Sequence, residues 1–366
     1  MKSQALNSQQ FDLYFSEMLE DYVTAIAWSP QGNILAACSA AGEVILWQHM
    51  PDSQEEWQRL PLQTSHNQSV DCLAFSSDGQ FLAAGGQAGI KVWQKHQDAE
   101  VNQWQLLNVA HSPTWVDRLA WNPVCNQLAL SLGRNVLVWD ATAPEATITL
   151  NFDASSVLGL DWSFDGQYLA IAGYQGVKIW ESQDWNEDPY IFDLPTATLA
   201  VAWSGDAKFF AIGNMDRTIA VFEWNNPNPW VMRGFPGKIR QITWSNVNSQ
   251  QNTALFAAAS VEGIVVWSKH PDDLVGWESR VLQHHVGVIQ AIAFQPQSLL
   301  LASAAEDGLV CLWHQAKNIS QILEGAPQGF SCLAWHPQGQ QLAAGGKNGE
   351  LRVWMRSRRG QGFNHR

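Results

Sequence analysis

Short hydrophobic runs alternate with polar turns along almost the whole chain. The runs are rich in Val, Ile, Leu and aromatic residues, and clusters of Gly, Pro, Asp, Asn or Ser separate them. This pattern is typical of β-strands. The apolar residues of a strand alternate with polar ones or form a continuous run, and Gly, Pro, Asp, Asn and Ser favour the backbone conformations of tight turns. Two of the turns, Ser76–Gly79 and Ser163–Gly166, end in a glycine suited to positive φ. The pattern predicts an all-β chain.

One pattern of runs and turns recurs eight times. Each copy opens with an apolar run ending in an aromatic residue, passes through a polar turn and a second apolar run, and closes on an alternating run. The closing aromatics lie 41 to 46 residues apart and are Trp47, Trp93, Trp139, Trp180, Phe222, Trp267, Trp313 and Trp354. A period of roughly 40–45 residues is the signature of a propeller blade of four strands.

A further strand candidate lies between successive units and supplies the fourth strand of each. These outer candidates begin at Trp57, Trp104, Ala146, Pro189, Pro229, Trp277 and Ile319. The last unit lacks one, and the unassigned segment Phe11–Phe15 can supply it. Because one blade cannot bury both of its faces, the units must stack around an axis and close. We expect a propeller over residues 11–355, an N-terminal arm over 1–10 and a basic, flexible tail over 356–366.

The units resemble the WD40-repeat β-propellers along nearly their whole length. Only Trp139–Asp140 keeps the dipeptide that names the family. The resemblance implies a supporting tetrad of His, Ser or Thr, Asp and Trp, which is complete in the seventh unit as His285, Ser303, Asp307 and Trp313. In the third unit, His111 is one residue out of register. Seven blades are most common in the family, so seven is the alternative to the eight four-stranded blades that we expect here.

The resemblance also implies where partners bind, because the residues that begin each first strand lie at the mouth of the central channel. Carried over, the candidate partner-binding residues are Tyr22, Asp71, Trp115, Asp117, Lys238 and Arg240, with Met215, Glu306 and Lys347 on neighbouring turns. We expect an aromatic and acidic arc on units one to three, with Lys238 and Arg240 about opposite. A peptide or domain would lie across this face with its basic end toward Asp71 and Asp117. The alternative is that these are ordinary rim residues.

Most of the 20 tryptophans have a structural explanation. Six occupy one place on the first strand, where Phe75 and Phe294 fill the other two units, and they are Trp28, Trp121, Trp162, Trp203, Trp244 and Trp335. A residue type that recurs at the same position of each repeat indicates packing between blades. Trp57, Trp104 and Trp277 share a place on the outer strand and are interpreted as cover for its edge. Trp115 is different, because no other unit has Trp at its place.

Composition narrows the function further. The chain carries 34 acidic and 21 basic residues, a net charge of −13, which argues against general nucleic-acid binding and against docking on anionic lipid. Its five cysteines include no CxxC pair, so neither a disulfide framework nor a zinc site is expected. No signal peptide or membrane-spanning run is evident, and the cytoplasm is the default compartment.

No catalytic or phosphate-binding motif stands out, so we expect no enzyme, no cofactor and no metal. The sequence therefore predicts a non-enzymatic, monomeric scaffold that binds an unidentified protein or peptide partner. Two alternatives stay open. One is a small-ligand-binding or enzymatic propeller that uses the central channel. The other is an architectural subunit that contacts its neighbours through the blade sides, which an exposed patch of Trp57, Trp104 and Trp277 would favour.

Overall fold

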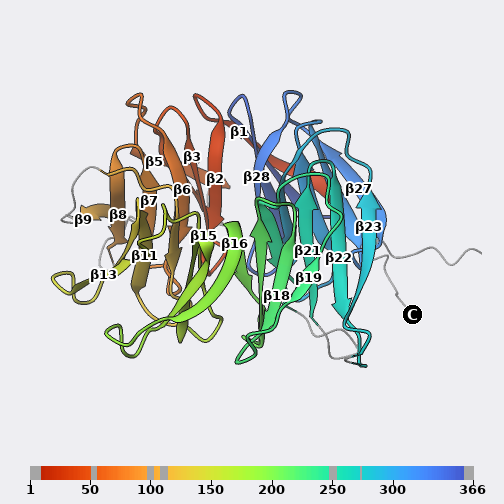
Figure 1. Ribbon diagram of the computed structural model, residues 1–366. Coiled ribbons are helices and arrows are strands. Elements are labelled where there is room, and N and C mark those ends of the chain that lie inside the picture. The colour runs from red at the N-terminus through yellow and green to blue at the C-terminus, as the bar shows by residue number, and fades with distance from the viewer. Residues whose placement is uncertain are drawn as a thin grey trace, which may run out of the picture.

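The computed structural model describes residues 10–50, 56–96, 103–107, 114–246, 254–272 and 274–357. Every regular element in these ranges is a β-strand, thirty in all (Figure 1). His111, almost all of the predicted N-terminal arm and most of the predicted basic tail lie outside the described residues.

The first half of the chain contains the strands of four repeat units. Unit one comprises β2 (Val23–Trp28), β3 (Ile34–Ser39), β4 (Val44–His49) and β5 (Trp57–Gln63). Unit two comprises β6 (Val70–Phe75), β7 (Phe81–Gly86), β8 (Gly89–Lys95) and β9 (Trp104–Leu107). Unit three comprises β10 (Leu119–Trp121), β11 (Gln127–Leu132), β12 (Asn135–Asp140) and β13 (Thr147–Asn151). Next come β14 (Gly159–Trp162), β15 (Tyr168–Glu181) and β16 (Tyr190–Trp203).

The second half continues the same succession. Unit five ends with β17 (Phe209–Asn214), β18 (Ile219–Glu223) and β19 (Trp230–Met232). Unit six comprises β20 (Gln241–Trp244), β21 (Leu255–Ser260), β22 (Gly263–Lys269) and β23 (Trp277–Gln283). Unit seven comprises β24 (Ile289–Phe294), β25 (Leu301–Ala305), β26 (Leu309–His314) and β27 (Asn318–Glu324). Unit eight comprises β28 (Phe330–Trp335), β29 (Gln341–Gly346), β30 (Glu350–Arg356) and the N-terminal β1 (Phe11–Met18).

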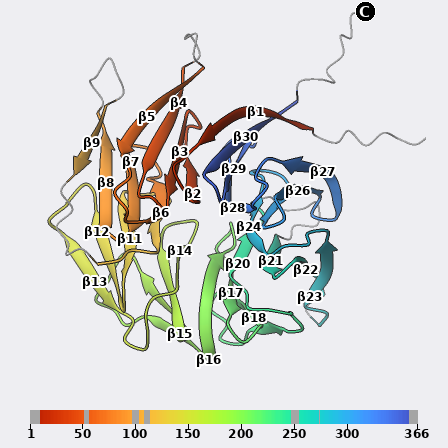
Figure 2. The same cartoon turned by 90° about the horizontal axis from the view of Figure 1, so that it is seen from above.

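These strands form seven antiparallel sheets arranged around a centre, six with four strands and one with six (Figure 2). The six-stranded sheet contains units four and five. Its β15 is a hairpin in itself, because the backbone N–H of Ser182 donates to the Gln167 carbonyl over 2.8 Å and so brings the two ends of the strand together. The chain reverses at Gln175 and Gly176, where φ is 72° and 111°.

In the same sheet, β16 runs without a break from the outer edge of unit four into the innermost position of unit five. Its first half pairs with β15 through Tyr190 and Ile179, and its second half pairs with β17 through Trp203 and Phe210. Eight repeat units therefore occupy seven hydrogen-bonded sheets. The predicted all-β, closed propeller is confirmed, and the joined sheet is what the sequence did not predict.

The N-terminal strand closes the ring. β1 pairs antiparallel with β30, with Phe11 opposite Arg356 and Met18 opposite Glu350, as Figure 2 shows where red meets blue. The Phe11 side chain is buried, and the amide of Gln321 on β27 both donates to and accepts from the Phe11 backbone, over 2.7 and 2.8 Å. The prediction that this segment completes the last blade is confirmed.

The first-strand aromatics pack between units. Five of the six indoles donate a hydrogen bond of 2.9–3.2 Å to a backbone carbonyl of the preceding unit, and the pairs are Trp28 to Ala334, Trp121 to Ala74, Trp162 to Ala120, Trp244 to Ala202 and Trp335 to Ala293. The sixth indole, that of Trp203, makes no such bond within the described residues. Neighbouring units are thus joined by polar contacts as well as by apolar packing.

The outer-strand tryptophans cover separate blades. Trp57, Trp104 and Trp277 are half-buried, and each lies 6.0 Å, between ring centroids, from the first-strand aromatic of its own unit. They cover the edges of three different sheets. They do not form the single exposed patch that would have favoured an architectural subunit.

Candidate functional site

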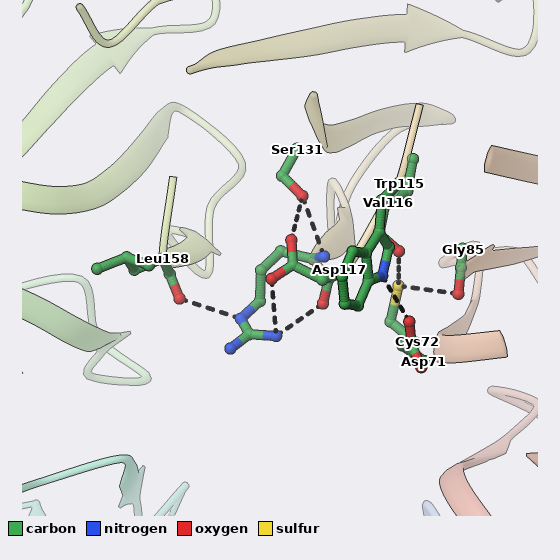
Figure 3. A network of polar contacts seen from close by, with 9 residues as sticks. Asp71, Cys72, Gly85, Trp115, Val116, Asp117, Ser131 and Leu158 are labelled. Atoms are coloured by element: carbon green, nitrogen blue, oxygen red, sulfur yellow. Dashed lines mark hydrogen bonds and ion pairs between the residues drawn. The ribbon is translucent and has the colours of Figure 1, made fainter. Parts of the chain in front are cut away.

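Trp115 is held in place at the start of the third unit by a carboxylate from the second. Its indole N–H donates to Asp71 Oδ2 over 2.6 Å, while the side chain stays 57% exposed (Figure 3). Just after it, Val116 is fully buried and its backbone N–H donates to the Gly86 carbonyl, which anchors the segment to unit two. The result is a large aromatic surface that faces solvent in a fixed orientation.

Asp117 lies beside Trp115 in the same network (Figure 3). Its Oδ1 accepts a 2.9 Å hydrogen bond from the Ser131 hydroxyl, and its Oδ2 lies 3.7 Å from the Arg118 guanidinium. Arg118 also donates to the Leu158 carbonyl over 3.0 Å and so connects unit three to unit four. Arg118 and Ser131 were not predicted as site residues, although Arg118 directly follows Asp117 in the sequence.

Tyr22 belongs to a different cluster from the one predicted for it. Its phenol lies beside Ser331, Lys347 and Glu306 of units seven and eight, and burial raises its pKa while Lys347 opposes that rise. Lys347 Nζ is 2.7 Å from Glu306 Oε1, which also accepts a 2.9 Å hydrogen bond from Gln290. Three of the predicted residues are therefore together here, on the opposite side of unit one from Trp115.

Lys238 and Arg240, by contrast, belong to neither of these two clusters. Both side chains are exposed, and within the described residues neither has a hydrogen bond or an ion pair. Unit six is four units from unit two, so these cations belong to the unit opposite that of Asp71 in the ring (Figure 2). Met215 of unit five is 49% exposed, and its backbone N–H donates to the Ala197 carbonyl over 2.9 Å. Tyr174, on the corresponding turn of unit four, is also exposed, and the repeat pattern does not identify it because Gly173 occupies the position equivalent to Met215.

The tetrad residues of unit seven form a hydrogen-bonded chain. His285 Nδ1 is 2.9 Å from Asp307 Oδ2, and its Nε2 is 2.8 Å from the Ser303 hydroxyl. The Trp313 indole donates to the same hydroxyl over 2.9 Å. All four groups are buried or nearly so, which ties the turn between β25 and β26 to the sheet.

Other chemistry is sparse in the described part of the chain. No group of three or more His, Cys, Asp or Glu side chains converges there as a metal site would require. Burial raises the pKa of the Cys38 and Cys332 thiols to about 12, so neither is a thiolate nucleophile at neutral pH. No helix capable of crossing a membrane occurs among the described residues.

Sequence comparison identifies relatives that share this repeat. The B-type cell cycle switch protein ccs52B of Medicago truncatula is 24% identical over 246 residues, which are 63% of this chain and 47% of that protein. The protein transport protein sec13 of Aspergillus fumigatus is 24% identical over 231 residues, 54% of this chain and 75% of that protein. The chain thus spans about half the length of the first of these relatives.

Solved structures share the fold over almost the entire chain. The crystal structure of Sqt1 from Chaetomium thermophilum superposes with a TM-score of 0.77 at 17% identity, covering 92% of this chain and 97% of that one. A second crystal structure, of Sqt1 bound to the N-terminus of the ribosomal protein L10, gives a TM-score of 0.74 at 18% identity.

The family model described as WD domain, G-beta repeat matches five segments that together make up half of the chain. The matched segments are residues 15–48, 59–94, 145–181, 276–314 and 317–355. They correspond to units one, two, four, seven and eight, whereas units three, five and six diverge from the family pattern. With its closed ring of four-stranded repeats and this match, the chain belongs to the WD40-repeat family.

Proposed function

We propose that the protein is a non-enzymatic scaffold that binds a protein or peptide partner across the channel-mouth face. The observation that carries the proposal is Trp115, an exposed indole whose only polar atom is already bonded to Asp71. Tyr, Trp and Arg are the residues that most often anchor interfaces, and an anchor that is already oriented loses little entropy on binding.

The charges on the face indicate the chemistry of the partner. Lys238 and Arg240 lack a counter-ion among the described residues and suit an acidic segment. Trp115 suits an apolar or aromatic side chain of the partner. The exposed Met215 of unit five, between Trp115 and the two cations in the order of the units, suits one as well. Asp71 and Asp117 already accept one hydrogen bond each, and Asp117 also lies 3.7 Å from the Arg118 guanidinium. A carboxylate has room for more donors, so both suit the basic end of the same partner.

Similarity to Sqt1 supports a peptide as one form of partner, because the Sqt1 propeller binds the N-terminus of a ribosomal protein. At 18% identity the likeness concerns the fold, so the partner of the present chain is argued from its own side chains.

The proposal is tested by peptide selection with matched variants. A displayed library of random peptides is selected on the immobilised wild-type protein, and affinities of the enriched peptides are measured by fluorescence anisotropy. The double variant Trp115→Ala, Lys238→Glu removes one exposed apolar side chain and reverses one free cation. The control Leu106→Ala, Arg59→Glu makes the same two changes on the outer strands β9 and β5, where both residues are exposed.

We expect the face variant to weaken binding at least tenfold and the control to retain wild-type affinity. Enriched peptides should carry an aromatic or aliphatic residue beside acidic ones. Equal affinities for wild type and face variant, together with a loss in the control, would place the interface on the blade sides and overturn the proposal.

A further inference from the structure

One ring of positions near the end of the first strands is almost uniformly alanine. The residue before the first-strand aromatic is Ala27, Ala74, Ala120, Asp161, Ala202, Thr243, Ala293 or Ala334, in order of the units. Only units four and six depart from alanine, and both departures are polar. Because the other six units fold with alanine there, neither the carboxyl of Asp161 nor the hydroxyl of Thr243 is a requirement of the repeat.

Both exceptions line the same cavity. It has a volume of about 320 Å³ and is bounded by first-strand ends and following turns of units three to six. Its aromatic walls are Trp121, Trp162, Phe164, Trp203 and Trp244. It lies at the opposite end of the first strands from Trp115. No Lys, Arg or His is among its lining residues, and Asp161 is the one titratable side chain there.

The Asp161 carboxyl lacks a cationic partner. Its Oδ2 accepts a 2.8 Å hydrogen bond from the backbone N–H of Trp203, and the Trp162 backbone also faces it, but no side chain in the described ranges donates to it. The Trp203 side chain, which also lines the cavity, is 6% exposed and has a buried Nε1 without an acceptor. The other five first-strand indoles all donate to the preceding unit. Among the six units that have a first-strand tryptophan, this one alone lacks the bond to the preceding unit within the described residues.

We propose that this cavity binds a primary alkylammonium group, supplied either by a free amine or by a lysine side chain of a partner. The ammonium would donate to the Asp161 carboxylate and to the Thr243 hydroxyl, and its alkyl stem would lie against the tryptophan faces. A carboxylate that is partly buried among apolar groups without a counter-ion is costly, and a bound cation would offset that cost. Indole faces attract cations as well.

The ionisation of Asp161 agrees with this assignment. Burial raises the pKa of its carboxyl to about 7, against partial compensation by the Trp203 and Trp162 backbone. A bound ammonium would stabilise the ionised form and so release the proton that the empty site holds near neutrality.

The test compares a cation with its neutral analogue. Binding of n-butylammonium and of n-butanol to the full-length protein is measured at pH 8 by calorimetry, with saturation-transfer NMR to detect weak binding. A short peptide with one internal lysine, and the same peptide with norleucine, distinguish a lysine side chain from a free amine. Binding of the small amine alone, or of both the amine and the lysine peptide, supports the proposal and identifies the source.

Three variants make the result specific. Asp161→Ala restores the residue that six units already carry, and Asp161→Asn keeps the shape and an acceptor for Trp203. Asp12→Asn removes an exposed carboxylate on β1 as the matched control. We expect wild type and Asp12→Asn to prefer butylammonium over butanol at least tenfold, and both Asp161 variants to lose the preference. Equal binding of amine and alcohol by the wild type, or an unchanged preference in folded Asp161→Ala, would overturn the proposal.

Discussion

Three sets of tryptophans in this molecule differ in what their indole N–H contacts. On the first strands it bonds to the neighbouring unit, as Trp28 does with Ala334. On the outer strands the ring is half-buried and its Nε1 atom has no acceptor in the described structure, as in Trp57. Ahead of the first strand of unit three, Trp115 bonds to a side chain, Asp71, and leaves its ring exposed. That a residue is tryptophan therefore says little about function here. A tryptophan at a position where no other unit has one, such as Trp115, says much more.

Asp161→Asn should stabilise the protein at alkaline but not at acidic pH. The folded-state pKa of about 7 lies above the usual 3.8, so the wild type loses stability as pH rises between these values. A pKa shift of one unit corresponds to about 1.36 kcal/mol of stability. Because the Asp161 side chain is only half-buried, we reduce the full value and expect the variant to be more stable than wild type by roughly 2 kcal/mol at pH 8. Urea denaturation of both proteins at pH 5 and pH 8 measures the difference, which should grow toward pH 8. A gap that is constant, or smaller at pH 8, would contradict the expectation.

At the scale of elements, the joined sheet and the closing strand show how the ring is held. β16 makes the link between units four and five by continuous pairing, whereas units one and two, for example, are joined by a loop between β5 and β6. β1 closes the circle through its pairing with β30 and through the bonds of Gln321 to the Phe11 backbone. The N-terminal segment is thus bound to two units at once.

Phe11→Ala should loosen this closure. Its ring is 1% exposed and lies 5.5 Å from that of Trp335, between centroids. Loss of a buried phenylalanine costs about 3–5 kcal/mol. We expect a fall of about 3 kcal/mol in the free energy of unfolding, measured by urea denaturation, with faster amide hydrogen exchange in β30. Asp12→Ala, an exposed neighbour on the same strand, serves as the control and should change neither. An identical response of the two variants would exclude a clamping role for Phe11.

For the whole molecule, the closed ring separates two faces. A first strand such as β2 has six residues, and at about 3.3 Å per residue its ends lie roughly 17 Å apart. Trp115 and the Asp161 cavity lie at opposite ends of such strands, in sheets that are paired throughout. A rigid array of this kind is suited to present two binding surfaces that do not influence each other.

The two surfaces should accordingly bind independently. Saturating butylammonium should leave the affinity of face-binding peptides unchanged within twofold, and Trp115→Ala, Lys238→Glu should leave butylammonium affinity unchanged within twofold. Anisotropy and calorimetric titrations, each with and without the other ligand, provide the measurement. A reciprocal change of more than fivefold would mean that the faces are coupled through the ring.

The repeat period, the four strands per unit and the N-terminal closure could all be read from the chain, because each depends on local patterns that recur at fixed spacing. The pairing of Tyr22 with Lys347 and Glu306 could not, because ring closure brings unit one beside units seven and eight. Nor could the shared sheet of units four and five, which depends on how β16 spans two blades. Asp161 and Thr243 are visible as exceptions in an aligned repeat. That they line one cavity depends on the order of the units around the axis and on the direction of side chains, which are properties of the folded ring.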